Sequence, residues 1–239
     1  MFLPKERIYL GWTCDFEDVC LLYPPLLGDI VKITYSKFKQ YTSLLTITQE
    51  EIQDIYVKQN IEGDLPTPFQ YFMVLSQLPE TGKLVNEALK FFTHETSLFL
   101  FERAEIVIGD LKEKHLLCED NFDYFQNCIR ELIGEKPIEK IEKDIDPRLA
   151  RMKAKQPLRD QIKNKQAQEK MGYEFSTLML STCCLGVGVT FENIDKLPYA
   201  TMMKLQELCA NKDKFETDMA SLIAGADSKK INLEYWVKD

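Results

Sequence analysis

The dominant pattern in this chain is the recurrence of apolar side chains every three or four residues. One run lies between Ile30 and Leu45, and another lies between Phe122 and Ile133. A third run begins after Pro198 and continues to Ile223. Because this spacing places apolar side chains on one face of an α-helix, it predicts a mainly α-helical protein.

Local signals at the expected helix ends support this prediction. Thr48 and Glu51 have the spacing of a capping box, and Thr67-Pro68 is typical of a helix start. We expect the helix that follows Pro68 to end at Pro79. Its apolar residues lie on almost every side of the helix, which predicts that the helix is central in the core. A further buried helix is expected at residues 175–185.

Two short segments have the character of β-strands. Residues 98–101 alternate leucine with phenylalanine, residues 106–108 are all β-branched, and four mostly polar residues separate the two runs. This pattern predicts an antiparallel hairpin at residues 97–108. Residues 17–23 predict another short strand, which ends before Pro24-Pro25. The expected fold class is therefore mainly α with a small antiparallel β element.

The charge distribution divides the chain. The whole chain has a net charge of −8, but residues 147–170, the basic segment, hold eight basic and two acidic residues. That segment is +6 and the remainder is −14. We predict a mainly helical N-terminal unit (residues 1–134), a charged linker with the basic helical segment (135–171) and a C-terminal helical unit (172–239).

The basic segment permits three interpretations. It could bind phosphate groups of a nucleic acid, dock on an acidic protein surface, or be a solvated linker. It lacks aromatic side chains for base stacking, so a nucleic-acid partner is the weaker expectation. An aromatic anchor is expected near the C-terminus. The candidate partner-binding residues are Arg148, Arg151, Lys153, Lys155, Arg159, Lys163, Tyr235 and Trp236.

No pattern in the sequence predicts catalysis. Gly186-Val187-Gly188 lacks the third glycine of a dinucleotide fingerprint, and only His94 and His115 could serve as histidine bases or ligands. The seven cysteines are odd in number, and the start of the sequence lacks the apolar core of a secretory signal, which together favour free thiols in a reducing compartment; no C-x-x-C pair is present. We therefore expect no catalytic residue, no cofactor and no metal site. No stretch reaches the roughly 18 apolar residues of a membrane span, so no membrane partner is expected.

Three motifs resemble a known family when they are taken together. They are residues 146–155 (DPRLARMKAK), 181–188 (STCCLGVG) and 221–230 (SLIAGADSKK), the last followed by Tyr235-Trp236. Residues 122–127 (FDYFQN) also fit. Their order resembles a family of small proteins encoded in the tail modules of phages and prophages of Gram-positive bacteria.

The resemblance implies a non-enzymatic phage morphogenesis factor, either a tail assembly chaperone or a related tail-module protein. Such a protein would bind a tape-measure or tail protein in the cytoplasm of the bacterial host, and it could form a homo-oligomer. A structural component of the virion is the first alternative. The second is a nucleic-acid-binding protein that acts through the basic segment.

Overall fold

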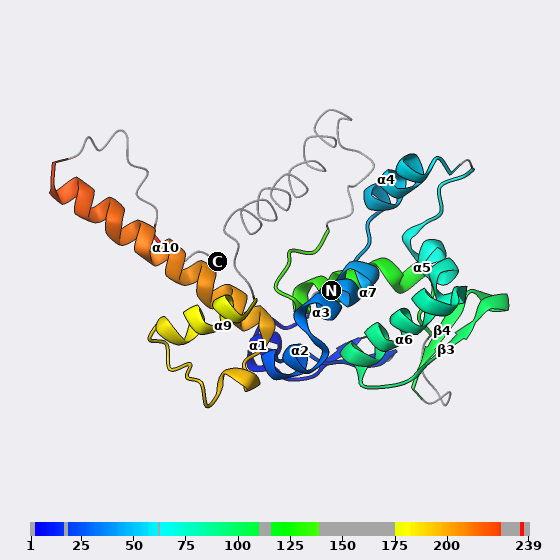
Figure 1. Ribbon diagram of the computed structural model, residues 1–239, viewed down its shortest axis with the longest axis horizontal. Helices are drawn as coiled ribbons and strands as arrows, with labels where there is room; N and C mark the ends of the chain where they lie inside the picture. Colours follow the sequence, from blue (N-terminus) through cyan, green and yellow to red (C-terminus); the bar gives the residue numbers. More distant parts are fainter. Residues whose placement is uncertain are drawn as a thin grey trace.

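The computed structural model describes residues 3–16, 19–61, 63–109, 116–138, 175–225 and 235–236. It confirms a mainly α-helical fold with a minor antiparallel β component (Figure 1). The elements are α1 (Lys5–Leu10), β1 (Cys14–Phe16), β2 (Cys20–Leu22), α2 (Leu27–Ile33), α3 (Tyr35–Leu45), α4 (Gln49–Gln59), α5 (Pro68–Gln77), α6 (Pro79–Thr93), β3 (Ser97–Leu100), η1 (Phe101–Arg103), β4 (Glu105–Ile108), α7 (Glu119–Leu132), α9 (Phe175–Cys184), η2 (Ile194–Lys196) and α10 (Tyr199–Ile223).

The hairpin predicted at residues 97–108 is confirmed. Strands β3 and β4 pair antiparallel, with Leu98 opposite Val107, and the short turn η1 joins them. A second antiparallel pair, β1 with β2, lies near the N-terminus. The strand predicted at residues 17–23 corresponds to β2, whereas its partner β1 was not predicted because a three-residue strand has too little periodicity to detect.

The apolar run between Ile30 and Leu45 forms two helices instead of one. The helical conformation is interrupted at Thr34, whose φ of 76° is positive, a value that threonine rarely adopts. The Thr34 side chain then accepts a hydrogen bond from the backbone N–H of Lys37 at 3.4 Å and caps α3. The periodicity continues across the break, so spacing alone could not locate it.

Both expected helix starts are confirmed. Thr48 Oγ1 accepts from the N–H of Glu51 at 3.2 Å, and Glu51 Oε2 accepts from the N–H of Thr48 at 3.0 Å. Thr67 and Gln70 form a second capping box. Each box satisfies backbone donors that the first helical turn leaves free.

The prediction that α5 is surrounded by the core is wrong. Val74 is 53% exposed and Leu78 is 50% exposed, while Phe69, Phe72 and Met73 are buried. The helix therefore buries one face only. Pro79 does not act only as a stop, because it is also the first residue of α6.

Aromatic rings form much of the centre of the protein. Phe122 on α7 packs against Phe69 and Phe72 of α5, with ring centroids 5.2 Å apart in both pairs. Burying a phenylalanine side chain stabilises a fold by about 1.5–3 kcal/mol, so this contact holds α5 and α7 together firmly. All three rings are at most 2% exposed.

The beginning of α10 is fixed to the N-terminal part of the chain. The N–H of Tyr199 donates to the carbonyl of Pro25 at 2.8 Å, and Thr201 Oγ1 donates to the carbonyl of Tyr9 at 2.7 Å. Tyr199 also packs edge to face on Phe38, with centroids 5.1 Å apart. The first turn of α10 therefore shares one apolar cluster with the N-terminal helices. The division into units at residues 134 and 171 stays a prediction, because much of the proposed connector lies outside the described residues.

Candidate protein-binding site

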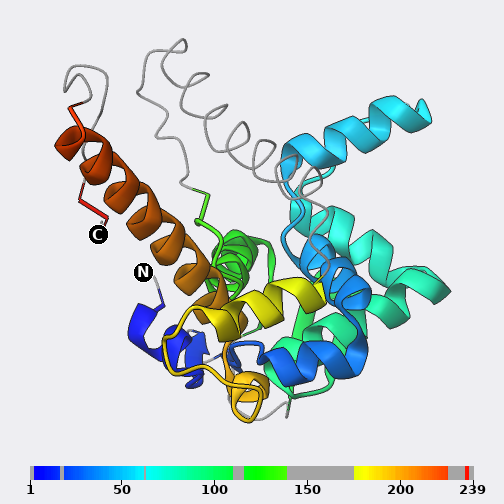
Figure 2. The ribbon, with the colours of Figure 1, turned by 60° about the vertical axis from the view of Figure 1, so that its left-hand side comes forward.

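Helix α10 leaves the body of the protein after its first turn. Its buried residues are Tyr199, Ala200 and Met202, all at its N-terminal end. Beyond its contacts with α9 near Gln206, the remainder extends away from the body, as two views of the ribbon show (Figures 1 and 2). Most helical stability in proteins comes from tertiary packing of an apolar face, and the far part of α10 has little such packing among the described residues.

An apolar stripe runs along the extending part of α10. Its members follow one another at steps of three, seven, four and three residues, which keeps them on one side of the helix, and each is partly exposed. Lys212 lies on the same side of the helix, between Leu208 and Phe215. Ile223 at the end of the helix is 82% exposed. We call the following residues the α10 stripe: Leu205, Leu208, Phe215, Met219 and Leu222.

Helix α9 supports α10 from a different side. Gln206 Nε2 donates to Ser181 Oγ and to Thr182 Oγ1, both at 2.9 Å. Successive residues of a helix are about 100° apart around its axis, so Gln206 and its contacts with α9 lie on a different side of α10 from Leu205 and the rest of the stripe. Consequently α9 holds the base of α10 and leaves the stripe available.

Helix α9 itself is less buried than the sequence predicts. Thr182 is its buried residue, and Leu180 is 51% exposed. Its first residue, Phe175, stacks on Tyr35 with ring centroids 4.4 Å apart and an interplanar angle of 2°. The apolar character of α9 thus reflects one aromatic contact with α3 and one packed side, and the helix does not lie within the core.

The structure brings the predicted aromatic anchor to the α10 stripe. The ring of Tyr235 meets the ring of Phe215 at an interplanar angle of 81°, with centroids 5.8 Å apart. Trp236 lies beside Tyr235, with centroids 5.9 Å apart. The sequence did not single out Phe215 as a site residue, although its place in a helical apolar pattern was visible. What the sequence could not show was that the core ends before Phe215.

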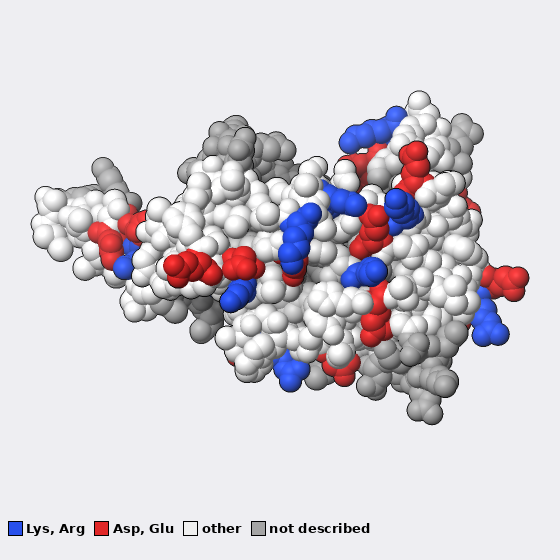
Figure 3. Space-filling model, turned by 60° about the horizontal axis from the view of Figure 1, so that its bottom comes forward, with Lys and Arg blue, Asp and Glu red and all other residues white. Residues whose placement is uncertain are grey.

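The basic residues predicted to bind a partner, Arg148, Arg151, Lys153, Lys155, Arg159 and Lys163, lie outside the described residues. The described surface drawn in Figure 3 carries its charges singly or beside charges of the opposite sign, with wide uncharged areas between them. Among the described residues, Lys37 and Glu87 form an ion pair whose Nζ and Oε2 atoms are 2.8 Å apart. This face therefore offers no extended basic surface for a nucleic acid.

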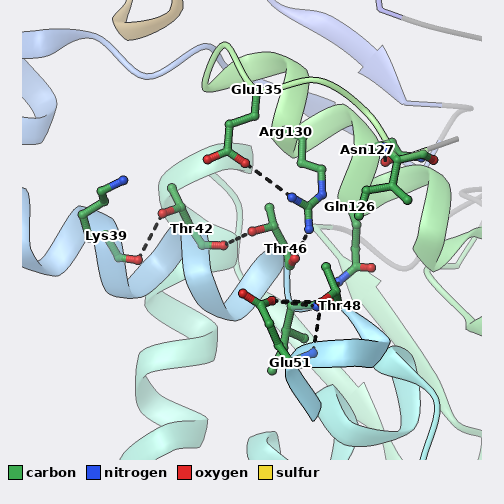
Figure 4. A network of polar contacts seen from close by, with 11 residues as sticks. Lys39, Thr42, Thr46, Thr48, Glu51, Gln126, Asn127, Arg130 and Glu135 are labelled. Carbon is green, nitrogen blue, oxygen red and sulfur yellow. Dashed lines mark hydrogen bonds and ion pairs between the residues drawn. The ribbon is translucent and has the colours of Figure 1, made fainter. Parts of the chain in front are cut away.

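A buried polar network connects α7 to the link between α3 and α4 (Figure 4). The guanidinium of Arg130 donates to the carbonyl of Thr46 and to Glu135 Oε2, the latter at 3.4 Å. Gln126 Nε2 donates to the carbonyl of Ile47 at 3.0 Å. The network joins side chains to backbone carbonyls, which indicates a structural role in fixing α7.

The electrostatic environment of Arg130 agrees with this role. Its side chain is 4% exposed, and burial lowers the pKa of its guanidinium, while the carboxylates of Glu135 and Glu51 raise it. The two terminal nitrogens of the planar fork are engaged by the carbonyl of Thr46 and by Glu135, while the Nε atom is buried without a hydrogen-bond partner among the described residues.

Two further side chains that could take part in catalysis, Cys14 and His94, have environments that indicate a structural role. Burial raises the pKa of the Cys14 thiol, so this cysteine stays protonated at neutral pH and is a poor nucleophile. His94 caps the end of α6 in a left-handed conformation and stacks on Tyr23 at 3.9 Å. Within the described ranges, no group of three His, Cys, Asp or Glu residues is placed to hold a metal ion.

In the part of the chain that the structure describes, no helix is both long enough and apolar enough to cross a membrane. Comparisons with protein-family models, curated proteins and solved structures gave no match. The functional argument therefore depends on the residues and on their arrangement.

Proposed function

We propose that this chain is a non-enzymatic phage morphogenesis factor that holds a helical segment of a tape-measure or tail protein against the α10 stripe. The observation that carries the proposal is an apolar side of α10, formed by the partly exposed Leu208, Phe215, Met219 and Leu222, on a helix that extends from the body. An amphipathic helix of a partner binds such a surface by laying its own apolar side along it.

The composition of the stripe suits an adaptable partner surface. Met219 has an unbranched and flexible side chain, which can adjust to partners of irregular shape. Phe215 supplies an aromatic anchor of the kind that contributes strongly to protein interfaces. Met202, by contrast, is fully buried in the core and serves packing.

The charges beside the stripe do not favour one sign of partner. Lys212 and Glu216 are partners in an ion pair with 3.7 Å between Nζ and Oε1, and Lys204 pairs with Glu207 at 3.0 Å. Exposed pairs of this kind contribute at most about 1 kcal/mol. Apolar contact is therefore the main source of affinity in this proposal, and it suits an aggregation-prone helical client.

The identity of the client comes from the resemblance to proteins of phage tail modules, which the motifs DPRLARMKAK, STCCLGVG and SLIAGADSKK carry. The proposed place of action is the cytoplasm of the bacterial host during assembly.

Co-expression tests the proposal directly. The tape-measure protein of the same phage or prophage is produced with and without this chain, and its soluble fraction and co-purification are measured. We expect the chain to increase the soluble fraction and to co-purify with the client. Unchanged solubility without co-purification would contradict the proposal, and a symmetric, stoichiometric copy number in purified particles would favour a structural role in the virion.

A further inference from the structure

The α10 stripe is already in contact with another part of its own chain. Tyr235 packs edge to face on Phe215, the central aromatic residue of the stripe, and Trp236 packs beside Tyr235. Edge-to-face geometry is the favourable arrangement for two aromatic rings, because the positive edge of one ring meets the negative face of the other.

We infer that the pair Tyr235–Trp236 is an intramolecular cover of the α10 stripe, which the client must displace in order to bind. This inference rests on the proposed function, since it names the regulation of the same site. It also revises the role that the sequence suggested, because Tyr235 and Trp236 become competitors of the partner instead of contacts to it.

The exposure of Tyr235 fits a cover that is easily released. The residue is 63% exposed, so its ring uses only part of its surface against Phe215. Phe215 itself is only partly exposed. A single aromatic pair of this kind corresponds to a change in affinity of about two- to tenfold, which a client with several apolar anchors can overcome.

Attachment within one chain makes so weak a contact effective. A tethered group acts at an effective concentration that is set by the length and stiffness of its connection. Only 19 residues lie between Phe215 and Tyr235 in the sequence. The cover would therefore shield the apolar stripe between rounds of client binding and would reduce non-specific association through it.

Removing the rings of Tyr235 and Trp236 distinguishes two roles for the pair. If the pair covers the stripe, client binding should increase, and if the pair anchors the client, client binding should decrease. In the full chain, the double variant Tyr235→Ser/Trp236→Ser is compared with wild type by two readouts. The first is the fluorescence of 8-anilinonaphthalene-1-sulfonate, a dye that binds exposed apolar surface. The second is the amount of co-expressed tape-measure protein that co-purifies. The matched control is Phe191→Ser, which removes an aromatic side chain that is 73% exposed and belongs to the connection between α9 and η2.

We expect the double variant to bind the dye about two- to tenfold more tightly and to retain more client than wild type, and the control to change neither. Adding Phe215→Ser and Leu222→Ser to the double variant should abolish the gain in dye binding, because the stripe itself is lost. Dye binding that stays at the wild-type level, or reduced client retention in the double variant, would overturn the cover. Increased dye binding without any client retention by wild type would uphold the cover and contradict the proposed function.

Discussion

The guanidinium of Arg130 on α7 donates a hydrogen bond to the backbone carbonyl of Thr46, which lies 84 residues earlier in the chain. Thr46 follows the last residue of α3, where a helix leaves carbonyl groups without helical partners. A single side chain of α7 therefore fixes the point at which α3 ends and the chain turns towards α4.

Replacing Arg130 by Met should destabilise the protein. The variant keeps most of the apolar volume but leaves the carbonyl of Thr46 buried without its donor, at a cost of about 1–3 kcal/mol. Urea denaturation would show this as a lower midpoint with an unchanged slope. The matched control Arg103→Met, at an exposed arginine, should change the free energy of unfolding by less than about 0.5 kcal/mol. An equal effect of both variants would contradict the structural role of Arg130.

Replacing Gly82 by Ala should also destabilise the protein, although alanine is normally the better helix residue by about 1 kcal/mol. A Cβ atom at Gly82 would collide with the backbone carbonyl of Ser76, and its next nearest atom, the carbonyl carbon of Ser76, would lie at 3.1 Å. We expect the steric cost to exceed the gain in helix propensity. Thermal unfolding that shifts to higher temperature would show that α5 and α6 pack less closely than described.

The interaction of Glu87 with Lys37 and Tyr41 predicts a dependence of stability on pH. The hydrogen bond from Lys37, followed by that from Tyr41, lowers the pKa of Glu87 below its ordinary value of 4.5, although burial opposes this. An acid whose pKa is lower in the folded state stabilises the fold above its ordinary pKa, and this contribution is lost as the pH falls through the lowered value.

The variant Glu87→Gln checks this dependence. At pH 7 it should lower the free energy of unfolding by less than about 1 kcal/mol, because both side chains of the pair remain partly exposed to solvent. The difference from wild type should shrink between pH 5 and pH 3, as Glu87 becomes protonated in wild type as well. A difference that stays constant over this range would show that Glu87 is not held in its charged form by Lys37.

Local structure was largely predictable from the sequence, because its causes are local. The capping box of Thr48 and Glu51 and the helix start at Thr67-Pro68 each depend on residues within one turn. The hairpin at residues 97–108 was equally visible, since it combines β-branched and aromatic residues with a short polar turn.

Burial was less predictable, because it depends on residues that are distant in the sequence. Val74 and Phe72 are both apolar residues of α5, yet one is 53% exposed and the other is fully buried. The same limit applies to the candidate site. The pattern of α10 showed Phe215 on an apolar side, but only the tertiary structure shows that the core ends at the first turn and that Tyr235 returns to Phe215.

The central claim is that a client protein binds the α10 stripe, and one comparison of variants tests it most directly. The amount of tape-measure protein that co-purifies per molecule of this chain is measured for wild type, for Leu208→Ser/Phe215→Ser and for the control Ala210→Ser/Thr217→Ser, whose substituted positions are exposed and lie off the stripe. Circular dichroism and urea denaturation first establish that each variant is folded. We predict that the stripe variant loses at least about tenfold in client affinity, since truncating a hot-spot residue of an interface costs about 2 kcal/mol or more, and that the control binds like wild type. Undiminished binding by the folded stripe variant would contradict the claim.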